Sequence, residues 1–416
     1  MEWPVARLAD CCIIRPPKAE ANKALDKDAE VSFVPMKSLG INTKEIRLEE
    51  IKSLGSVSGS YTYFAENDVL LAKITPCFEN GKLGIASGLI NGIGFGSSEF
   101  IVFRTREKLI PEFLYYFLLQ PSFRDEGKAH MKGAVGHKRV SKEYVEGTKI
   151  PIPTLTEQKR IVAILDQAFA DIDRARALTE QNLKNARELF DSTLQQVFSQ
   201  MGQRCNVRSM SDSSLLEMID GDRGKNYPKK SDFLAEGHCL FLSTKNVRPD
   251  GFLFDELLFI NKSRDDLLRN GRLRRNDIVI TTRGTIGNLA LYDDSVEFKN
   301  IRINSGMLIL RPNTEVLLPS FLFELMRSGI IKRQIEDKVS GAAQPQLPIR
   351  TLNSFTLPIP LDLRLQQSVV ESAQSIQVQI EELSNRYIEK LNNLEELKKS
   401  LLQKAFSGQL TTKDAA

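Results

Sequence analysis

The chain has 416 residues, of which 57 are basic and 53 acidic, so its formal net charge is +4. At ordinary domain sizes this length corresponds to about two to four domains. Hydrophobic residues make up 41% and charged residues 26%, a composition that excludes a chain disordered throughout. No apolar stretch approaches the roughly 20 residues of a membrane-spanning helix, so no membrane association is expected.

The cysteine pattern favours a reducing compartment. The five cysteines are Cys11, Cys12, Cys77, Cys205 and Cys239. Their number is odd and no C-x-x-C pair occurs, so neither a disulfide framework nor a zinc site is expected. The first residues, 1–4, have no basic flank and no long apolar run, so no signal peptide is expected. We therefore predict a cytoplasmic protein.

Residues 1–155 have the pattern of a mixed α+β domain. Short apolar runs such as residues 69–72 alternate with turn signals such as Asn80-Gly81, which is typical of strands joined by loops. Residues 111–120 are typical of a short helix. The order of the strands cannot be predicted from this pattern.

Residues 156–202 are predicted to form one long helix. The Ile-Pro-Ile-Pro segment at 150–153 favours an extended chain, and no proline or glycine follows between Thr156 and Phe198. Apolar residues then recur at spacings of three and four, as in the seam of a coiled coil. The seam residues predicted here are Ile161, Leu165, Ile172, Leu183 and Phe190.

Residues 203–362 repeat the mixed pattern, residues 363–410 repeat the long helix, and residues 411–416 form a short C-terminal tail. The second helix carries the same apolar spacing. Its predicted seam residues are Val369, Ile376, Ile380, Leu383, Leu394, Leu397 and Leu401.

The two halves are copies of one unit. Phe241 lies 208 positions after Phe33, and Met307 lies 207 positions after Phe100, within segments of the same pattern. A near-constant offset over several segments indicates two equivalent halves, with an internal pseudo-two-fold axis as the expected arrangement. The two long helices would then pair as an antiparallel coiled coil. The alternatives are separate surface helices or pairing between chains.

The positive charge is concentrated in the two mixed domains. Residues 1–155 carry a net charge of +2 and residues 203–362 carry +3, whereas the two helical segments carry −1 and 0. Acid-free basic stretches fall where loops are expected, as in residues 127–142. Lys and Arg there suit DNA phosphates, and Arg, Asn and Gln suit base edges, although a solvated surface is the alternative. The predicted DNA-binding residues are Lys73, Thr75, Asn80, Lys82, His137, Lys138, Arg139, Arg223, Lys225, Tyr227, Lys245, Arg274, Thr282, Arg283, Thr285, Gln344 and Gln346.

Motifs of catalysis are missing. The sequence contains no Walker A motif, no G-x-G-x-x-G fingerprint, no amino-methyltransferase N-P-P-[FYW] motif and no metal-binding His or Cys pattern. The turn at 284–287 is predicted to be a tight strand turn. Glu297-Phe298-Lys299, after Asp293 and Asp294, resembles a nuclease element only faintly and has no counterpart in the first half. We expect no catalytic and no metal-binding residues.

Several motifs resemble those of specificity (S) subunits of type I restriction-modification enzymes. They are P-I-P-T-L-T-E-Q-K-R-I-V at 151–162, L-L-Q-K-A-F-S-G-Q-L at 401–410, and the strand-loop segments at 68–76 and 277–287. The resemblance covers essentially the whole chain. The segment at 360–367 departs from it, because Leu365 and Gln367 replace the expected Glu and Lys.

The resemblance implies two target-recognition domains, each reading one half of a split, asymmetric site in double-stranded DNA. The coiled coil would set the spacer between the half-sites. Two methyltransferase (M) subunits, and restriction (R) subunits in the full complex, would be the partners. This chain would hold no cofactor, because S-adenosylmethionine, ATP and magnesium would sit in the partners. The alternative function is a coiled-coil scaffold whose globular ends bind proteins.

Overall fold

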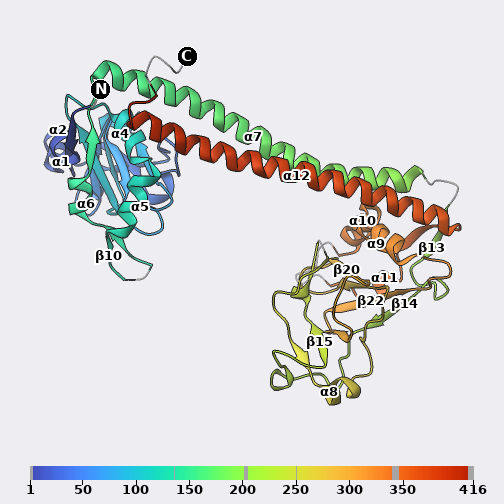
Figure 1. The fold of residues 1–416 in the computed structure, drawn as a ribbon. Helices are drawn as coiled ribbons and strands as arrows, with labels where there is room; N and C mark the ends of the chain where they lie inside the picture. Colours follow the sequence, from blue (N-terminus) through green and yellow to red (C-terminus); the bar gives the residue numbers. More distant parts are fainter. Residues whose placement is uncertain (1–2, 135, 201–204, 250, 340–345, 411–416) are drawn as a thin grey trace. The chain divides into compact units, whose positions relative to one another are not determined.

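The computed structural model describes residues 3–134, 136–200, 205–249, 251–339 and 346–410. The chain divides into two compact units. The first unit contains residues 1–180 and 389–416, and the second contains residues 181–388. The division falls inside both long helices, α7 (Leu155–Gln200) and α12 (Leu363–Phe406), so each unit holds a segment of each helix (Figure 1).

The first unit contains three sheets of main interest. Strands β2, β9, β6 and β7 form an antiparallel sheet in that order, and β4, β3, β8 and β5 form a second sheet in which β3 and β8 are parallel. Strands β1 and β12 pair next to the start of α7. The strands are β1 (Val5–Arg7), β2 (Cys12–Ile14), β3 (Glu30–Val34), β4 (Glu50–Ser53), β5 (Thr62–Ala65), β6 (Val69–Ala72), β7 (Leu83–Ile85), β8 (Ile93–Gly96), β9 (Phe100–Thr105), β10 (Met131–Lys132), β11 (Arg139–Val140) and β12 (Lys149–Pro151). The short helices are α1 (Leu8–Cys11), α2 (Ala19–Ala24), α3 (Leu54–Val57), α4 (Pro111–Leu118), α5 (Pro121–Ala129) and α6 (Lys142–Gly147).

The second unit repeats this topology. Strands β14, β22, β19 and β20 form the four-stranded sheet, β15 pairs with β21 in parallel, and β13 pairs with β23 beside the start of α12. The strands are β13 (Cys205–Ser209), β14 (Leu216–Asp220), β15 (Cys239–Leu242), β16 (Val247–Arg248), β17 (Gly251–Phe252), β18 (Phe259–Ile260), β19 (Asp277–Thr281), β20 (Leu289–Tyr292), β21 (Ile301–Ile303), β22 (Met307–Pro312) and β23 (Thr356–Pro360). The short helices are α8 (Lys262–Leu267), α9 (Pro319–Arg327), α10 (Gly329–Val339) and α11 (Ile349–Leu352). The predicted α+β fold with two similar domains is therefore confirmed.

A buried ion pair recurs in both units at the start of the central strand. Asp68 accepts two hydrogen bonds from the Arg104 guanidinium, at 2.8 and 2.7 Å, and Asp277 accepts two from Arg311, both at 2.8 Å. Both carboxylates are 1% exposed. Each pair ties the central strand, β6 or β19, to the neighbouring strand. Arg104 and Arg311, which occupy matching positions in the two units, thus have a structural role.

The long helices pair within the chain. In the first unit, Asp173 of α7 pairs with Lys398 of α12, and Arg176 pairs with Glu395. The residue number rises along one helix as it falls along the other, so the segments are antiparallel. In the second unit, Leu194 of α7 shares a buried core with α12, and Figure 1 shows the same antiparallel arrangement of the two segments. The intrachain interpretation is confirmed in each unit.

The predicted seam is largely correct. Four of its side chains are buried: Ile161, Leu165, Ile172 and Val369. Six are half-buried: Leu183, Ile376, Ile380, Leu383, Leu394 and Leu401. Leu397 was wrongly included, because it is 46% exposed. A spacing of three from Leu394 places it beyond the narrow face that packs against α7. The side chain of Phe190 lies outside the described residues.

A buried glutamine joins each long helix to its domain. Gln158 is fully buried; its Oε1 accepts from the Ile110 N–H at 3.0 Å, and its Nε2 donates to the carbonyls of Lys108 and Pro153 at 2.8 and 3.0 Å. Gln366 occupies the matching place in α12. One side-chain amide thus forms hydrogen bonds with backbone groups of two segments: the one that precedes the domain's short helix and the Pro-rich one that precedes the long helix.

Replacing Gln366 with leucine is expected to lower the free energy of unfolding of the second unit by about 2–4 kcal/mol. The change would leave the Leu318 N–H and the Val316 and Pro360 carbonyls without the partners they now have at 2.8, 2.9 and 2.9 Å. Each unsatisfied buried group costs about 1–3 kcal/mol, partly relieved by relaxation. Urea denaturation measures the change. The exposed neighbour Gln367→Leu is the control, and an equal loss there would contradict this account.

Candidate nucleic-acid interface

The loop that follows β6 forms an edge of the first unit. The Lys73 N–H donates to the Glu99 carbonyl, and the Lys73 carbonyl accepts from the Val140 N–H, both at 2.9 Å. Ile74 forms an isolated antiparallel bridge with Arg139. Three segments that are distant in the sequence therefore meet at the carboxyl end of β6. We call Lys73, Ile74, Glu99 and Arg139 the first edge.

The loop that follows β19 forms the corresponding edge of the second unit. The Thr282 N–H donates to the Gly306 carbonyl at 2.8 Å, and the Thr282 carbonyl accepts from the Leu347 N–H at 3.0 Å. Arg283 forms the matching bridge with Gln346. We call Thr282, Arg283, Gly306 and Gln346 the second edge.

The two edges share a backbone frame and differ in their side chains. The matched positions are Lys73 and Thr282, Ile74 and Arg283, Glu99 and Gly306, and Arg139 and Gln346. Each backbone contact in one unit has its counterpart in the other, so the strands present these positions in the same way. A basic, an apolar and an acidic side chain in one edge are replaced by polar, basic and small residues in the other. The edges can therefore recognise different chemical patterns.

Charges in the first edge are paired. The Arg139 guanidinium donates two hydrogen bonds to Glu99, at 2.9 and 2.7 Å. The Lys73 ammonium donates to the Ser98 carbonyl at 2.7 Å and lies 3.9 Å from the Glu99 carboxylate. Hydrogen bonding from Arg139 lowers the pKa of Glu99, and burial lowers the pKa of Lys73. An ionised carboxylate thus holds both basic side chains in place, and it is itself an acceptor for a base amino group.

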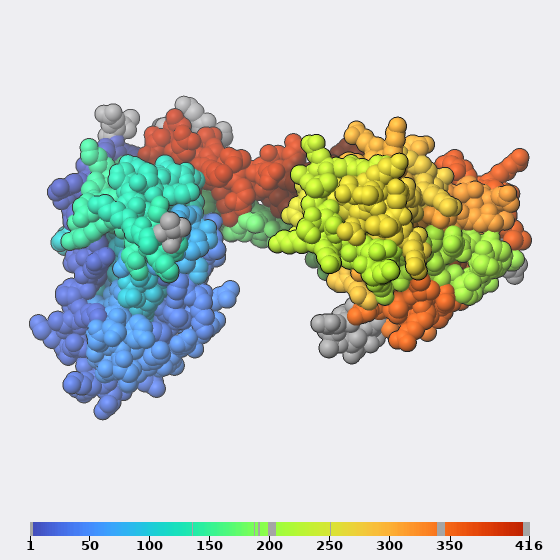
Figure 2. Space-filling model, turned by 90° about the horizontal axis from the view of Figure 1, so that it is seen from below, coloured from blue at the N-terminus to red at the C-terminus, as the bar shows by residue number. Residues whose placement is uncertain are grey.

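The β10–β11 hairpin adds exposed basic groups to this edge. Lys132, His137 and Lys138 are exposed on it, and the Thr75 N–H donates to the Lys138 carbonyl at 2.9 Å. The hairpin projects from the first unit in Figure 1, and its teal surface faces the viewer in Figure 2. Residues 73–75 and 137–139, predicted separately, are therefore neighbours.

Two further predicted residues of the first unit, Asn80 and Lys82, belong to the segment between β6 and β7, and one relevant residue was missed. Lys82 lies opposite the last residue of β6, because the Ala72 N–H donates to its carbonyl at 3.0 Å, and its ammonium donates to the Met36 carbonyl at 2.9 Å. Asn80 lies in the loop between β6 and β7, where its N–H donates to the Pro76 carbonyl at 3.0 Å. Arg15 is exposed, and its positive charge contributes to the lowered pKa of Lys73. Arg15 has only one basic residue near it in the sequence, Lys18, so the sequence pattern did not indicate a DNA-binding role for it.

The second edge contains an exposed cation. Arg283 is exposed and forms no ion pair with the residues that the structure describes. Gly284 and Gly287 have φ values of +74° and +84°, so the predicted tight turn is confirmed there. Thr285 is exposed in the turn, whereas the Thr282 side chain is buried, with 5% exposure. Thr282 therefore supports the edge rather than lining its surface.

Three more of the predicted DNA-binding residues in the second unit are exposed. Arg223 lies near the second edge, because its guanidinium contacts the Ser305 carbonyl at 3.4 Å and pairs with Asp220 at 3.0 Å. Lys245 is exposed and pairs with Glu256 at 2.9 Å. Lys225 is exposed in the same loop as Arg223.

Two predicted residues are placed differently. Tyr227 packs edge-on against Phe241, with ring centroids 5.7 Å apart, so its ring serves a small hydrophobic core. Arg274 precedes β19 and Arg283 follows it, so they lie at opposite ends of that strand. Gln344 lies outside the described residues.

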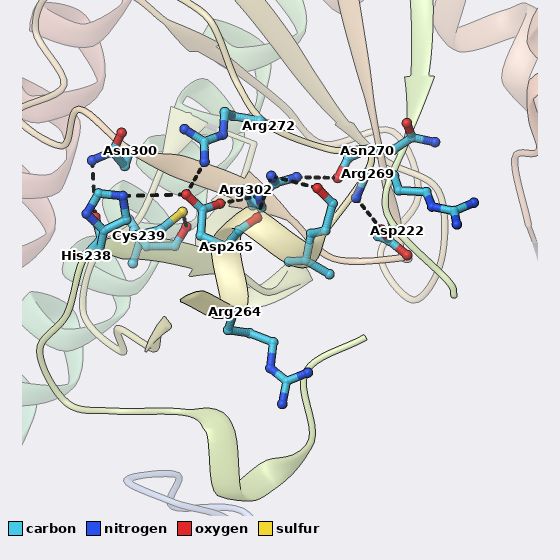
Figure 3. Close-up of polar contacts among 12 residues, drawn as sticks. Asp222, His238, Cys239, Arg264, Asp265, Arg269, Asn270, Arg272, Asn300 and Arg302 are labelled. Carbon is cyan, nitrogen blue, oxygen red and sulfur yellow. Dashed lines mark hydrogen bonds and ion pairs between the residues drawn. The ribbon is translucent and has the colours of Figure 1, made fainter. Parts of the chain in front are cut away.

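Arg272 (Figure 3) and Arg275, in the basic segment 269–275, form contacts within the second unit but remain exposed. Asp265 is fully buried, and it pairs with Arg302 of β21 and with Arg272. The Arg302 guanidinium also donates to the Asn270 carbonyl at 2.8 Å. Arg275 lies 4.2 Å from the centre of the Tyr292 ring. The tertiary structure thus gives Arg272 and Arg275 partners within the unit, whereas the buried arginine of this network is Arg302 of β21.

The same network holds the loop that carries Arg223. The Asp222 carboxylate accepts from the backbone N–H groups of Gly224 and Arg269, at 2.7 and 2.8 Å (Figure 3). Burial opposes ionisation of Asp222, but these backbone donors lower its pKa below the usual range. An ionised Asp222 therefore fixes the two loops next to each other.

The described residues include no group of three or more His, Cys, Asp or Glu side chains that could hold a metal ion. Within the same parts of the chain, no helix combines the length and apolarity needed to cross a lipid bilayer.

Comparison with known proteins identifies the family. Residues 1–183 and 210–395 match the type I restriction modification DNA specificity domain, so the chain belongs to that family. The specificity subunit of the type I restriction enzyme EcoAI from Escherichia coli is 36% identical over 180 residues, covering 42% of this chain and 31% of the relative. The chain therefore matches only about a third of that relative's length.

Two solved structures share the fold. A chain from a structure that describes complex assembly and conformational transition of the type I R-M system has a TM-score of 0.80 at 20% identity, covering 98% of both chains. The HsdS subunit from Thermoanaerobacter tengcongensis has a TM-score of 0.62 at 20% identity, covering 98% of this chain and 97% of that chain.

Proposed function

We propose that this chain is the DNA-sequence specificity subunit of a type I restriction-modification complex. Each unit reads one half of a bipartite, asymmetric site in double-stranded DNA. The paired helices set the spacer between the half-sites. Family membership supports this role, and so does the location of exposed basic residues at the edges of both units.

The observation that carries the proposal is the matched pair of edges. A protein that reads two different half-sites needs the same scaffold twice with different side chains at the points of contact. The edges meet this requirement, because Ile74, Glu99 and Arg139 in one are replaced by Arg283, Gly306 and Gln346 in the other. Base edges in the major groove are distinguished by such differences in donors and acceptors.

The proposal includes the partners. Two methyltransferase (M) subunits bind this chain, and restriction (R) subunits join in the full complex. The chain itself is non-catalytic and holds no cofactor, whereas S-adenosylmethionine, ATP and magnesium act in the partners. The complex works in the cytoplasm. A small net charge is compatible with this role, because the partners supply further phosphate contacts.

The alternative is a coiled-coil scaffold whose globular ends bind proteins. Mapping methylated adenines in the host genome tests the choice. We expect one bipartite motif that disappears when the gene for this chain is deleted and returns when it is restored. Unchanged methylation would contradict the proposed function.

Replacing Arg283 with alanine is expected to alter recognition of one half-site only. Arg283 is exposed in the second edge, where a bidentate contact to a base is worth about 1–3 kcal/mol of discrimination. The measurement is competition binding of the complex with M subunits to duplexes that are altered in one half-site or the other. The variant Lys73→Ala, which changes the first edge, should alter recognition of the other half-site.

The control is Lys262→Ala, which removes one exposed positive charge from α8 of the same unit. It should leave the preference at both half-sites unchanged. If Arg283→Ala weakened binding equally for the cognate and for unrelated DNA, Arg283 would be a phosphate contact and not a reader of bases.

A further inference from the structure

A cavity of about 720 Å³ opens in the second unit, away from the second edge. Its walls come from β17 and the residues after it, from residues 291–298 at the end of β20, from α9, and from Gln374 and Gln377 of α12. It shares no residue with the second edge. Its volume lies within the range of about 300–1,000 Å³ that is typical of small-molecule sites.

Aromatic rings line this cavity. Phe252 and Phe254 stack with centroids 5.5 Å apart, and Phe298 meets Phe254 edge-on at 5.1 Å. Phe323 contributes a fourth ring from α9. Phe252 and Phe254 are only half-buried, although both are large apolar side chains. The faces of such rings attract organic cations and pack against aliphatic chains.

A buried carboxylate in the cavity has an unused acceptor. The Glu324 side chain is 7% exposed. Its Oε1 lies 3.4 Å from the Arg327 guanidinium, whereas its Oε2 is buried and has no hydrogen-bond partner in the described structure. Buried polar atoms in native proteins are nearly always paired, because an unpaired one costs about 1–3 kcal/mol. Oε2 is therefore an acceptor that a donor from outside the chain could satisfy.

The charge of the lining favours a cation. Three acidic residues, Asp293, Glu297 and Glu324, are among the lining residues, together with one basic residue, Arg327. Arg327 is engaged with Glu324, contacts the Gln377 amide oxygen at 3.3 Å and lies 5.2 Å from the centre of the Phe323 ring. Burial raises the pKa of Glu324, and a cation beside it would favour the ionised form.

We propose that this cavity binds an organic cation: a protonated amine or guanidine on an aliphatic chain. The cationic group donates to Glu324 Oε2, and the chain lies against the Phe254 ring. The same chemistry is available from a free polyamine and from a basic side chain of a protein, and the experiment distinguishes the two. The inference does not rest on the proposed reading of DNA.

Isothermal titration of the full chain provides the test, with spermidine and a short acetylated, amidated Gly-Arg-Gly peptide as probes. We expect saturable binding of one probe per chain, and at least about tenfold weaker binding to Glu324→Gln, which corresponds to about 1.4 kcal/mol. Glu315→Gln is the matched control, because it removes an exposed carboxylate from the same unit outside the cavity. Its affinity should equal that of the unmodified chain.

The probes separate the sources: binding of spermidine identifies a free amine as the ligand, and binding of the peptide alone identifies a protein side chain. If Glu324→Gln does not fold, as judged by circular dichroism, Phe254→Ala replaces it, and we expect about fivefold or greater weakening. Saturable binding of neither probe, or equal affinity in the variant and the control, would overturn the inference. DNA binding by Glu324→Gln is expected to be unchanged, so the two proposals can fail separately.

Discussion

Replacing Asp277 with alanine is expected to lower the free energy of unfolding of the second unit by about 3–5 kcal/mol. Asp277 is 1% exposed and holds the Arg311 guanidinium through two hydrogen bonds of 2.8 Å. It also accepts from the Arg274 N–H at 2.7 Å. Without Asp277 the Arg311 guanidinium keeps the more distant Glu217 carboxylate, at 3.7 Å, and loses its two short hydrogen bonds. Breaking one side of a buried ion pair costs more than the net contribution of the pair. Urea denaturation with hydrogen exchange at β19 measures it.

Two controls test this explanation. Glu256→Ala removes an exposed partner of Lys245 in the same unit and should change stability by less than about 1 kcal/mol. The double variant Asp277→Leu with Arg311→Met removes both charges and should recover most of the lost stability. If the double variant were as unstable as the single one, the cost would come from packing and not from the loss of the Asp277 carboxylate beside Arg311.

Deleting one heptad from each long helix is expected to shorten the preferred DNA spacer, with both half-site sequences unchanged. This expectation rests on the proposed function. The deletion removes residues 181–187 of α7 and 384–390 of α12, which are opposite each other in the register of the Asp173–Lys398 pair. Seven helical residues span about 10 Å, which corresponds to about 3 base pairs. Binding to a series of duplexes with different spacers measures the effect.

The control keeps the length and changes only the surface. Leu178 is 67% exposed on α7, and Leu178→Gln should leave the preferred spacer unchanged. An unchanged spacer after the heptad deletion would mean that the helices do not act as a ruler. Loss of one half-site sequence instead would indicate that the deletion had disturbed a recognition domain.

The repeat made much of the fold predictable. Periodic apolar residues and the absence of proline and glycine identify α7 and α12, because helix formation depends on neighbours within the same turn. The offset of about 208 residues predicts two copies of one domain. The sheets that contain the matching strands β6 and β19 have the same strand order. The error at Leu397 arises because a spacing of three or four fits a face wider than the one that packs.

The candidate site was predictable only in part. The loops at 73–75, 137–139 and 283–285 were identified as basic or polar segments between strands. Their proximity was not predictable, since the bridge between Ile74 and Arg139 joins residues 65 positions apart. The structural role of Arg272 was not predictable either, because its partner Asp265 is recognised as buried only in the folded unit.

The sequence by itself determined the internal repeat, the two long helices, the α+β class and the resemblance to specificity subunits, because these follow from local spacing and from motifs. Only the tertiary structure decided which basic residues face solvent and which are committed to buried carboxylates such as Asp68, Asp265 and Asp277. It also decided which side chains share an edge. The physical reason is that strand pairing and charge burial are non-local: a +4 chain distributes its charges according to partners that are far away in the sequence.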